Sequence, residues 1–196
     1  GDEYHGDSGP LSVSDTRIKL NLLEKFMDAA EEKGIPKVTD FNKGDNFGCG
    51  YFQVTEKNGL RCSAAVGYLN PVKSRKNLKI ETNCHVKKIN FDGTKAVSVS
   101  FWKGDKLITI KANKEILLSA GSIGSTQILQ ASGVGNGNKL SNLGIKIIKN
   151  LRGVGQNLQD HLMFRPVYKI QNIKSLNKKI NSIFGNLLIG LEFIFN

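Results

Sequence analysis

Apolar side chains recur every three or four residues in one segment near the N-terminus. They stand at Leu20, Leu23, Phe26, Met27 and Ala30. This spacing predicts an amphipathic helix that Ser14 or Asp15 caps and that runs to about Lys33. Gly34 and Pro36 come next, and both residue types end helices.

The middle of the chain shows shorter, strand-like runs instead. We predict strands over residues 78–80, 86–91, 96–102, 107–110 and 115–118. Gly93 and Gly104 separate three of these runs, and the pair Asp92-Gly93 is a strong hairpin signal. The pattern therefore indicates one strand, then a β-meander, then a final buried strand at 116–118.

The rest of the chain is predicted as short elements joined by loops. The predicted elements are a strand just before residue 14, a helix over 61–69, a helix between residues 122 and 133, strands over 145–148 and 162–170, and an apolar helix after residue 175. Residues 40–58 are rich in Gly and Asn and are typical of a loop.

The composition is that of a globular protein with a basic surface. The chain has 196 residues, of which 39% are hydrophobic and 23% charged, and its net charge is +11. These values exclude collagen-like, low-complexity and wholly disordered classes. No apolar run reaches the roughly 18 residues of a membrane span. Few of the cations are Arg and they are scattered along the chain, which argues against specific nucleic-acid recognition. A polyanion-binding module is the weakest of three candidate functions.

The cysteines and the first residues add two expectations. Cys49, Cys62 and Cys84 form no C-x-x-C pair, so we expect no zinc site and three mostly buried thiols. The chain opens on Gly1 without an initiator Met or a signal-peptide pattern, which suggests a segment of a longer protein.

The turn Ala120-Gly121-Ser122 follows a predicted strand and precedes a predicted helix. Small side chains let a ligand approach the backbone, and a helix N-terminus supplies N–H groups and positive potential. Such a turn therefore suits a pyrophosphate. A tight strand-to-helix turn also needs small residues without any ligand, so both interpretations stay open on this feature alone.

The surroundings of this turn resemble a known family, the glucose–methanol–choline (GMC) oxidoreductases. Residues matching the family's second signature are Gly121, Ser122, Ser125, Ile128, Leu129, Ser132, Gly133, Val134 and Gly135. Other stretches that match in order are Tyr4-His5-Gly6, Gly9-Pro10-Leu11, Tyr68-Leu69-Asn70-Pro71, Lys76-Asn77-Leu78 and Gly153 to His161. The resemblance runs almost end to end and is closest to the insect-type branch. Thr126 stands where the family signature has Pro, a residue that suits the first turn of a helix.

The resemblance implies a mixed α/β fold. We expect part of a Rossmann-like FAD-binding domain with an inserted β-meander, together with part of the substrate-binding domain. Residues 1–75 would be a linking segment of the substrate domain, 76–160 part of the FAD-binding domain, and 161–196 the start of the substrate-binding domain.

The resemblance also implies which residues contact the cofactor FAD. Val86 matches a valine whose backbone contacts the adenine side, and Ala120, Gly121 and Ser122 match the turn that closes over FAD. Asn157 matches a segment that returns toward the flavin. No catalytic or metal-binding residue is expected in this chain, because the family's Gly-x-Gly-x-x-Gly loop and its catalytic His segment have no match here.

The leading functional hypothesis is a fragment of an FAD-dependent oxidoreductase. It would act on the CH–OH group of a small alcohol and pass hydride to the flavin, with no nucleic-acid partner and no membrane span. The alternative is a truncated, non-catalytic paralogue without bound flavin. An insect-type member would be expected outside the cell, because such members are commonly secreted.

Overall fold

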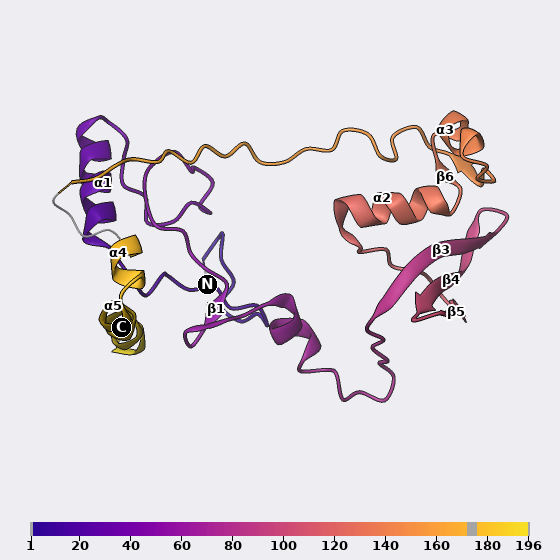
Figure 1. The fold of residues 1–196 in the computed structure, drawn as a ribbon, viewed down its shortest axis with the longest axis horizontal. Coiled ribbons are helices and arrows are strands. Elements are labelled where there is room, and N and C mark those ends of the chain that lie inside the picture. The colour runs from indigo at the N-terminus through magenta and orange to yellow at the C-terminus, as the bar shows by residue number, and fades with distance from the viewer. Residues whose placement is uncertain (1, 172–175, 196) are drawn as a thin grey trace. The chain divides into compact units, whose positions relative to one another are not determined.

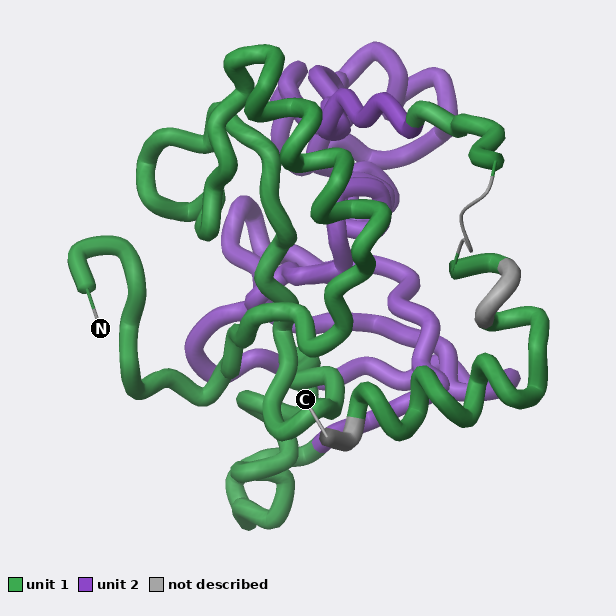
Figure 2. The backbone as a smooth tube through the Cα atoms, turned by 90° about the vertical axis from the view of Figure 1, so that its left-hand side faces the viewer, with its two compact units in different colours: residues 1–79, 166–196 green, residues 80–165 purple. Residues whose placement is uncertain are grey.

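The computed structural model describes residues 2–171 and 176–195. The chain divides into two compact units, Gly1–Lys79 with Pro166–Asn196 and Ile80–Arg165 (Figure 2). Figure 1 shows the course of the helices and strands along the chain. Within the described residues, no helix is both long enough and apolar enough to span a bilayer. The mixture of helices and antiparallel strands confirms the predicted mixed α/β class.

The first unit contains the predicted amphipathic helix, but this helix begins later than expected. Helix α1 spans Asn21–Glu32 with Leu20 at its N-cap, so the predicted start at Ser14 or Asp15 is wrong. Ser14 instead exchanges two backbone hydrogen bonds with Val54 at 2.9 Å each, which holds its backbone extended. The predicted stop is confirmed, because Gly34 follows with a φ of 83°.

A short hairpin and a single wide helical turn follow in the same unit. Strands β1 (Glu56–Lys57) and β2 (Leu60–Arg61) pair antiparallel. The predicted helix over 61–69 is reduced to the π-helix η1 at Ala65–Leu69. Gly67 of this helix lies against the Pro10 carbonyl, where a Cβ would come within 2.7 Å of the oxygen. This approach seats the N-terminal Gly-Pro-Leu segment on η1 and explains the glycine.

The C-terminal part of the first unit is helical. Helices α4 (Leu176–Ile180) and α5 (Ile183–Phe195) confirm the predicted apolar helix. The strand predicted over 162–170 is wrong, because these residues form neither helix nor strand. A strand needs a hydrogen-bonded neighbour, and the described residues supply none to this segment. Its apolar side chains are therefore exposed, with Leu162 and Val167 more than nine-tenths accessible.

The second unit is built on the predicted β-meander. Strands β3 (Cys84–Asp92), β4 (Lys95–Lys103) and β5 (Lys106–Lys111) pair antiparallel in that order. The two turn glycines, Gly93 and Gly104, each have a φ of 57°. This left-handed conformation is the one for which hairpin turns select glycine. The meander and both of its turns are thus confirmed.

A second block of this unit follows the meander. Helix α2 (Gly121–Ala131) packs against β3 and leads into β6 (Val134–Gly135). Helix α3 (Gly137–Asn142) then connects to β7 (Lys149–Asn150), which pairs parallel with β6. The strand predicted over 145–148 is therefore wrong, because the strand that pairs with β6 is formed by Lys149 and Asn150.

Two further predicted strands do not form. Residues 78–80 and 115–118 are neither helix nor strand. Leu117 is 82% exposed rather than buried as expected. The apolar sequence of 116–118 suits a strand covered on both faces, but no described strand runs beside it to supply hydrogen bonds.

The signature residues Ser132 and Gly133 join α2 to its neighbours. The Ser132 hydroxyl accepts the buried Ile89 N–H of β3 at 2.8 Å and donates to the Ile128 carbonyl of α2. Gly133 has a φ of 90°, and a Cβ there would lie 2.3 Å from the Lys146 carbonyl oxygen. These two residues are therefore required by the packing of this unit.

Candidate functional site

The turn before α2 is an exposed helix N-terminus that no side chain caps. Ala120 occupies the N-cap position without a side-chain cap, and its own N–H donates to the Ser125 hydroxyl at 3.1 Å. Ala120, Gly121 and Ser122 are all exposed. The first N–H groups of a helix have no intrahelical acceptor, so they are free to meet a ligand at this turn.

Gly121 leaves the backbone of this turn open. Its φ is 78°, and nothing lies within 4 Å of the place where a Cβ would stand. The positive φ is a conformational reason for glycine here, and the open space leaves the backbone of the turn accessible. Free N–H groups and the positive end of the helix dipole favour an oxyanion or a carbonyl oxygen. The turn therefore fits the polar edge of a cofactor such as FAD.

Val86 lies near the start of β3, opposite Phe101 of β4. It is half-buried. The register of the β3–β4 pair shifts between Val86 and Lys88, which marks a β-bulge. Bulges re-aim the strand and recur next to binding sites, and this one directs the backbone of β3 immediately after Val86.

Asn157 lies in the loop that follows β7 and adopts a left-handed φ of 54°. The same loop packs on the side of α2 through Gly155, where a Cβ would come within 2.7 Å of Gln130 Nε2. Gln130 in turn donates to the Val154 carbonyl at 3.4 Å. The loop is thus attached to α2, while Asn157 itself is exposed.

The structure puts all five predicted site residues in the second unit, Ile80–Arg165. The turn begins α2, Val86 lies on the strand against which α2 packs, and the loop of Asn157 lies along the same helix. Over the part of the chain that the structure describes, no cluster of three or more His, Cys, Asp or Glu could hold a metal ion. The three cysteines are free.

Sequence reasoning missed Gln130, which attaches the later loop through the Val154 carbonyl. It named Ser125 only as a signature match and did not predict that this hydroxyl accepts the Ala120 N–H. The interpretation of Thr126 as a first-turn residue is wrong, because α2 already begins at Gly121. The Thr126 hydroxyl instead donates to the Ser122 carbonyl at 2.8 Å, a bond within the helix that proline could not make.

Solved structures with a similar fold include oxidoreductases, one of them described as FAD-dependent. The chain aligns with an FAD-dependent oxidoreductase from Chaetomium thermophilum at a TM-score of 0.76 and 37% identity, covering 79% of this chain and 27% of that one. It aligns with pyridoxine 4-oxidase from Mesorbium loti at a TM-score of 0.74 and 28% identity, covering 80% and 31%. The fold is thus a mixed α/β fold of the kind found in an FAD-dependent oxidoreductase.

Sequence comparisons name the family. The GMC oxidoreductase family model matches residues 3–163, and the chain belongs to that family. It is 43% identical over 197 residues to the oxygen-dependent choline dehydrogenase of Pectobacterium atrosepticum and 41% identical over 195 residues to that of Vibrio vulnificus. These matches span 99% and 98% of this chain but only 35% of the length of each relative.

Proposed function

We propose that this chain is part of an FAD-dependent oxidoreductase that oxidises the CH–OH group of a small alcohol and passes hydride to the flavin. The observation that carries the proposal is the 43% identity, over 99% of this chain, to an oxygen-dependent choline dehydrogenase. Choline, whose oxidised group is a primary alcohol, is accordingly the first substrate to test.

Within such an enzyme, we assign the cofactor contacts to the five residues described above. Backbone N–H groups at Gly121 and Ser122 would hold a polar edge of FAD, because the turn is uncapped and exposed. Ala120, whose own N–H is taken by Ser125, would contact the cofactor through its small side chain at the turn. The backbone of Val86 would meet the adenine side, and Asn157 would return toward the cofactor. FAD, when bound, accepts the hydride; the contribution of these residues is binding and orientation.

The division into domains follows the same proposal. We assign 76–160 to the FAD-binding domain, 1–75 to a linking segment of the substrate domain and 161–196 to the start of the substrate-binding domain. The compact unit Ile80–Arg165 supports the first assignment, since its limits lie within five residues of the proposed ones.

The insect-type branch and the extracellular location stay predictions. The two choline dehydrogenases reported above are bacterial and do not decide between branches. A test of the branch should identify the electron acceptor as well as the substrate. Oxygen consumption with choline would align the protein with the oxygen-dependent dehydrogenases, whereas turnover only with an artificial acceptor would favour a dehydrogenase of another branch.

The proposal is tested on purified recombinant protein that carries this chain. We expect a flavin absorbance spectrum and bleaching of that spectrum by choline or another small primary alcohol under anaerobic conditions. A protein that retains no flavin and transfers no electrons from any alcohol tested would contradict the proposal and favour the non-catalytic paralogue.

A pair of glycine variants tests the assigned turn. Gly121→Val puts a branched side chain over the open backbone, and we expect at least a tenfold loss of flavin affinity, about 1.4 kcal/mol. Gly104→Val is the matched control, because Gly104 also has a positive φ and open space around it but lies in a hairpin turn of the meander. Equal flavin loss in both variants would mean that backbone strain, not the turn, is responsible.

A further inference from the structure

The dipeptide Asn-Gly occurs at two places in the chain, Asn58-Gly59 and Asn136-Gly137. Asparagine is a chemically labile residue, and it reacts with the backbone most readily when a glycine follows, because glycine puts no side chain in the way. Neither pair belongs to the proposed cofactor contacts. The structure places the two pairs in different surroundings, so their reactivity can be compared within one molecule.

Asn58 and Gly59 form the turn of the hairpin made by β1 and β2. Their φ values are 53° and 79°, and Lys57 pairs with Leu60 across the turn, which is the type I′ pattern. Asn58 is exposed, and within the described residues no hydrogen bond holds its side chain or the Gly59 N–H. Each strand has only two residues, and so short a hairpin opens readily. The side chain and the next nitrogen can therefore meet.

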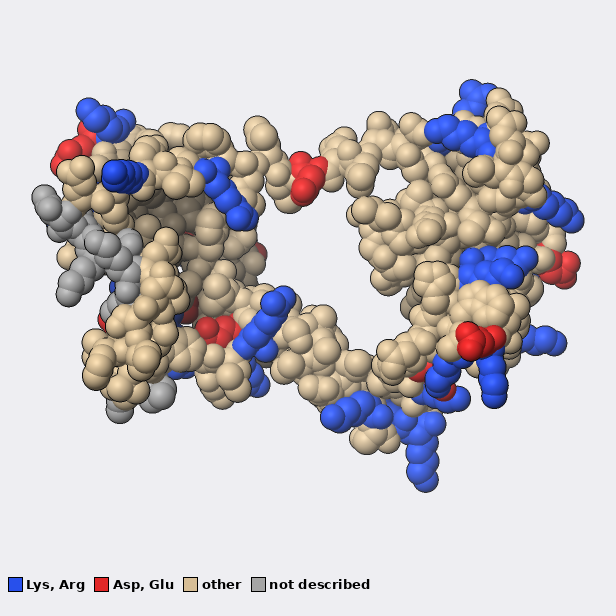
Figure 3. Space-filling view, viewed as in Figure 1, with Lys and Arg blue, Asp and Glu red and all other residues tan. Residues whose placement is uncertain are grey.

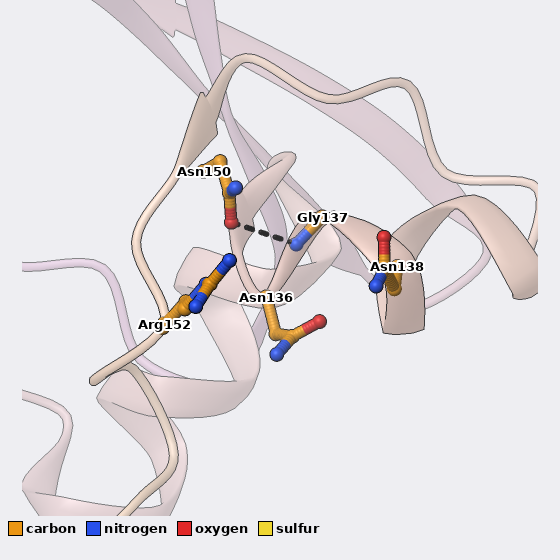
Figure 4. A pocket seen from close by; sticks show the side chains of 5 residues that line it. All are labelled: Asn136, Gly137, Asn138, Asn150 and Arg152. Carbon is orange, nitrogen blue, oxygen red and sulfur yellow. Dashed lines mark hydrogen bonds between the residues drawn. The ribbon is translucent and has the colours of Figure 1, made fainter.

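Asn136 and Gly137 are held at both of the groups that would react. Asn136 Oδ1 accepts the Lys139 N–H at 3.2 Å, which fixes the side chain as the N-cap of α3. The Gly137 N–H donates to Asn150 Oδ1 at 3.0 Å (Figure 4). Gly137 is also buried. A reaction at this pair therefore requires the loss of two hydrogen bonds and the opening of a packed region.

We propose that Asn58 is a site of spontaneous deamidation in the folded protein and that Asn136 is protected from the same reaction. The Gly59 nitrogen gives up its proton and bonds to the side-chain carbonyl carbon of Asn58. The carboxamide nitrogen takes up a proton and leaves as ammonia. Water then opens the resulting succinimide ring at one of its two carbonyls, which leaves aspartate or isoaspartate at position 58. Water is the only co-reactant.

The product places a negative charge next to an existing ion pair. Arg17 Nε lies 3.1 Å from Glu56 Oε1, and the same guanidinium donates to the Phe193 carbonyl of α5 at 3.3 Å. A Cβ at Gly59 would lie 3.4 Å from Arg17 Cζ, so the turn adjoins this pair. The chain has a net charge of +11, and Figure 3 shows that Lys and Arg predominate on one face. The product is less basic by one charge, so cation exchange separates it from the unmodified protein.

The proposal is tested by incubating the purified protein at mildly alkaline pH and following both sites in the same sample by peptide mass spectrometry. We expect the mass increase of deamidation to accumulate at Asn58 at least about tenfold faster than at Asn136, which corresponds to the net contribution of two hydrogen bonds. Equal rates in the folded protein, or a faster reaction at Asn136, would overturn the proposal. The readout involves no flavin, so it is independent of the proposed oxidoreductase activity.

The same protein unfolded in guanidinium chloride is the control for sequence. The dipeptide is identical at the two sites, so we expect similar rates once the structure is lost. A difference that persists undiminished in the unfolded protein would overturn the proposal, because the surrounding structure would then not be its cause.

A pair of variants tests the protection of the second site. Asn150→Ala removes the acceptor of the Gly137 N–H, so deamidation at Asn136 should accelerate about threefold or more, while the rate at Asn58 stays unchanged. Asn138→Ala is the matched control, because Asn138 is exposed beside the same turn, and it should change the rate at Asn136 by less than about twofold.

Circular dichroism of both variants checks that the fold is retained. An unchanged rate at Asn136 in a folded Asn150→Ala protein would overturn the proposed protection. Equal acceleration by the two variants would overturn it as well, because it would show a general loosening of α3 and no specific effect of the Asn150 hydrogen bond.

Discussion

Asp2 organises the N-terminal Tyr4-His5-Gly6 motif as a network of hydrogen bonds. Its Oδ1 accepts the backbone N–H groups of Tyr4 and His5 at 2.9 Å each and lies 2.8 Å from His5 Nδ1. The other ring nitrogen of His5 lies 3.0 Å from Asp40 Oδ2. The backbone bond from Tyr4, followed by the bond from His5, lowers the pKa of Asp2 to about 2. The motif is thus ordered by one carboxylate.

We predict that the Asp2 carboxyl titrates near pH 2 in the folded protein, against an ordinary pKa of 3.8. Because the folded pKa is depressed, the stability from this carboxylate is present above about pH 4 and is lost as the pH falls toward 2. Carboxyl ¹³C shifts recorded against pH measure the midpoint. His5→Gln should raise it only in part, since both backbone donors remain; a wild-type midpoint at 3.8 would contradict the prediction.

At the scale of elements, one hydroxyl couples α2 to the meander. Ser132 is buried and bonds both the Ile89 N–H of β3 and a carbonyl of α2. Ile89 is itself only 6% exposed, so water cannot readily replace the serine. The two hydrogen bonds of Ser132 therefore hold the C-terminal end of α2 against the sheet. The candidate turn lies at the other end of the same helix.

Ser132→Ala should lower the free energy of unfolding by about 1–3 kcal/mol, the cost of leaving a buried N–H without an acceptor. Urea denaturation followed by circular dichroism measures it. Ser141→Ala, at an exposed position of α3, is the control and should stay within about 0.5 kcal/mol of the wild type. Equal stabilities of the two variants would show that the Ser132 bond contributes nothing.

At the scale of the whole molecule, hydrogen bonding is unevenly distributed. Strand β4 is paired on both sides, by β3 and β5. Residues 156–171 form no helix or strand and expose Leu162, Val167 and their neighbours. Local stability follows the number of protected backbone hydrogen bonds and buried contacts, so the two regions should differ widely.

Hydrogen–deuterium exchange should therefore be slowest in β4 and close to the unprotected rate over 156–171. Mass spectrometry of peptides from the two regions gives the comparison within one sample. Protection of 156–171 equal to that of β4 would contradict the prediction and would mean that other contacts cover this segment in solution.

Several features could be predicted because their signals are local. The meander follows from alternating side chains and two turn glycines, and the end of α1 follows from Gly34. The start of α1 could not be predicted in this way. Ser14 is a good capping residue, but its backbone is engaged by Val54, forty positions along the chain.

Some features of the candidate site could likewise be predicted from local sequence, and others depend on contacts between distant residues. The family could be recognised from motifs spaced along the chain. The meander and the small residues of the turn at 120–122 were readable because their signals lie between neighbours in the chain. The fold in three dimensions decided that Gly155 lies on α2, that Asn150 accepts the Gly137 N–H, and that 116–118 pairs with no described strand. Those outcomes depend on which distant backbone groups meet, and such groups leave no periodic signal in the sequence.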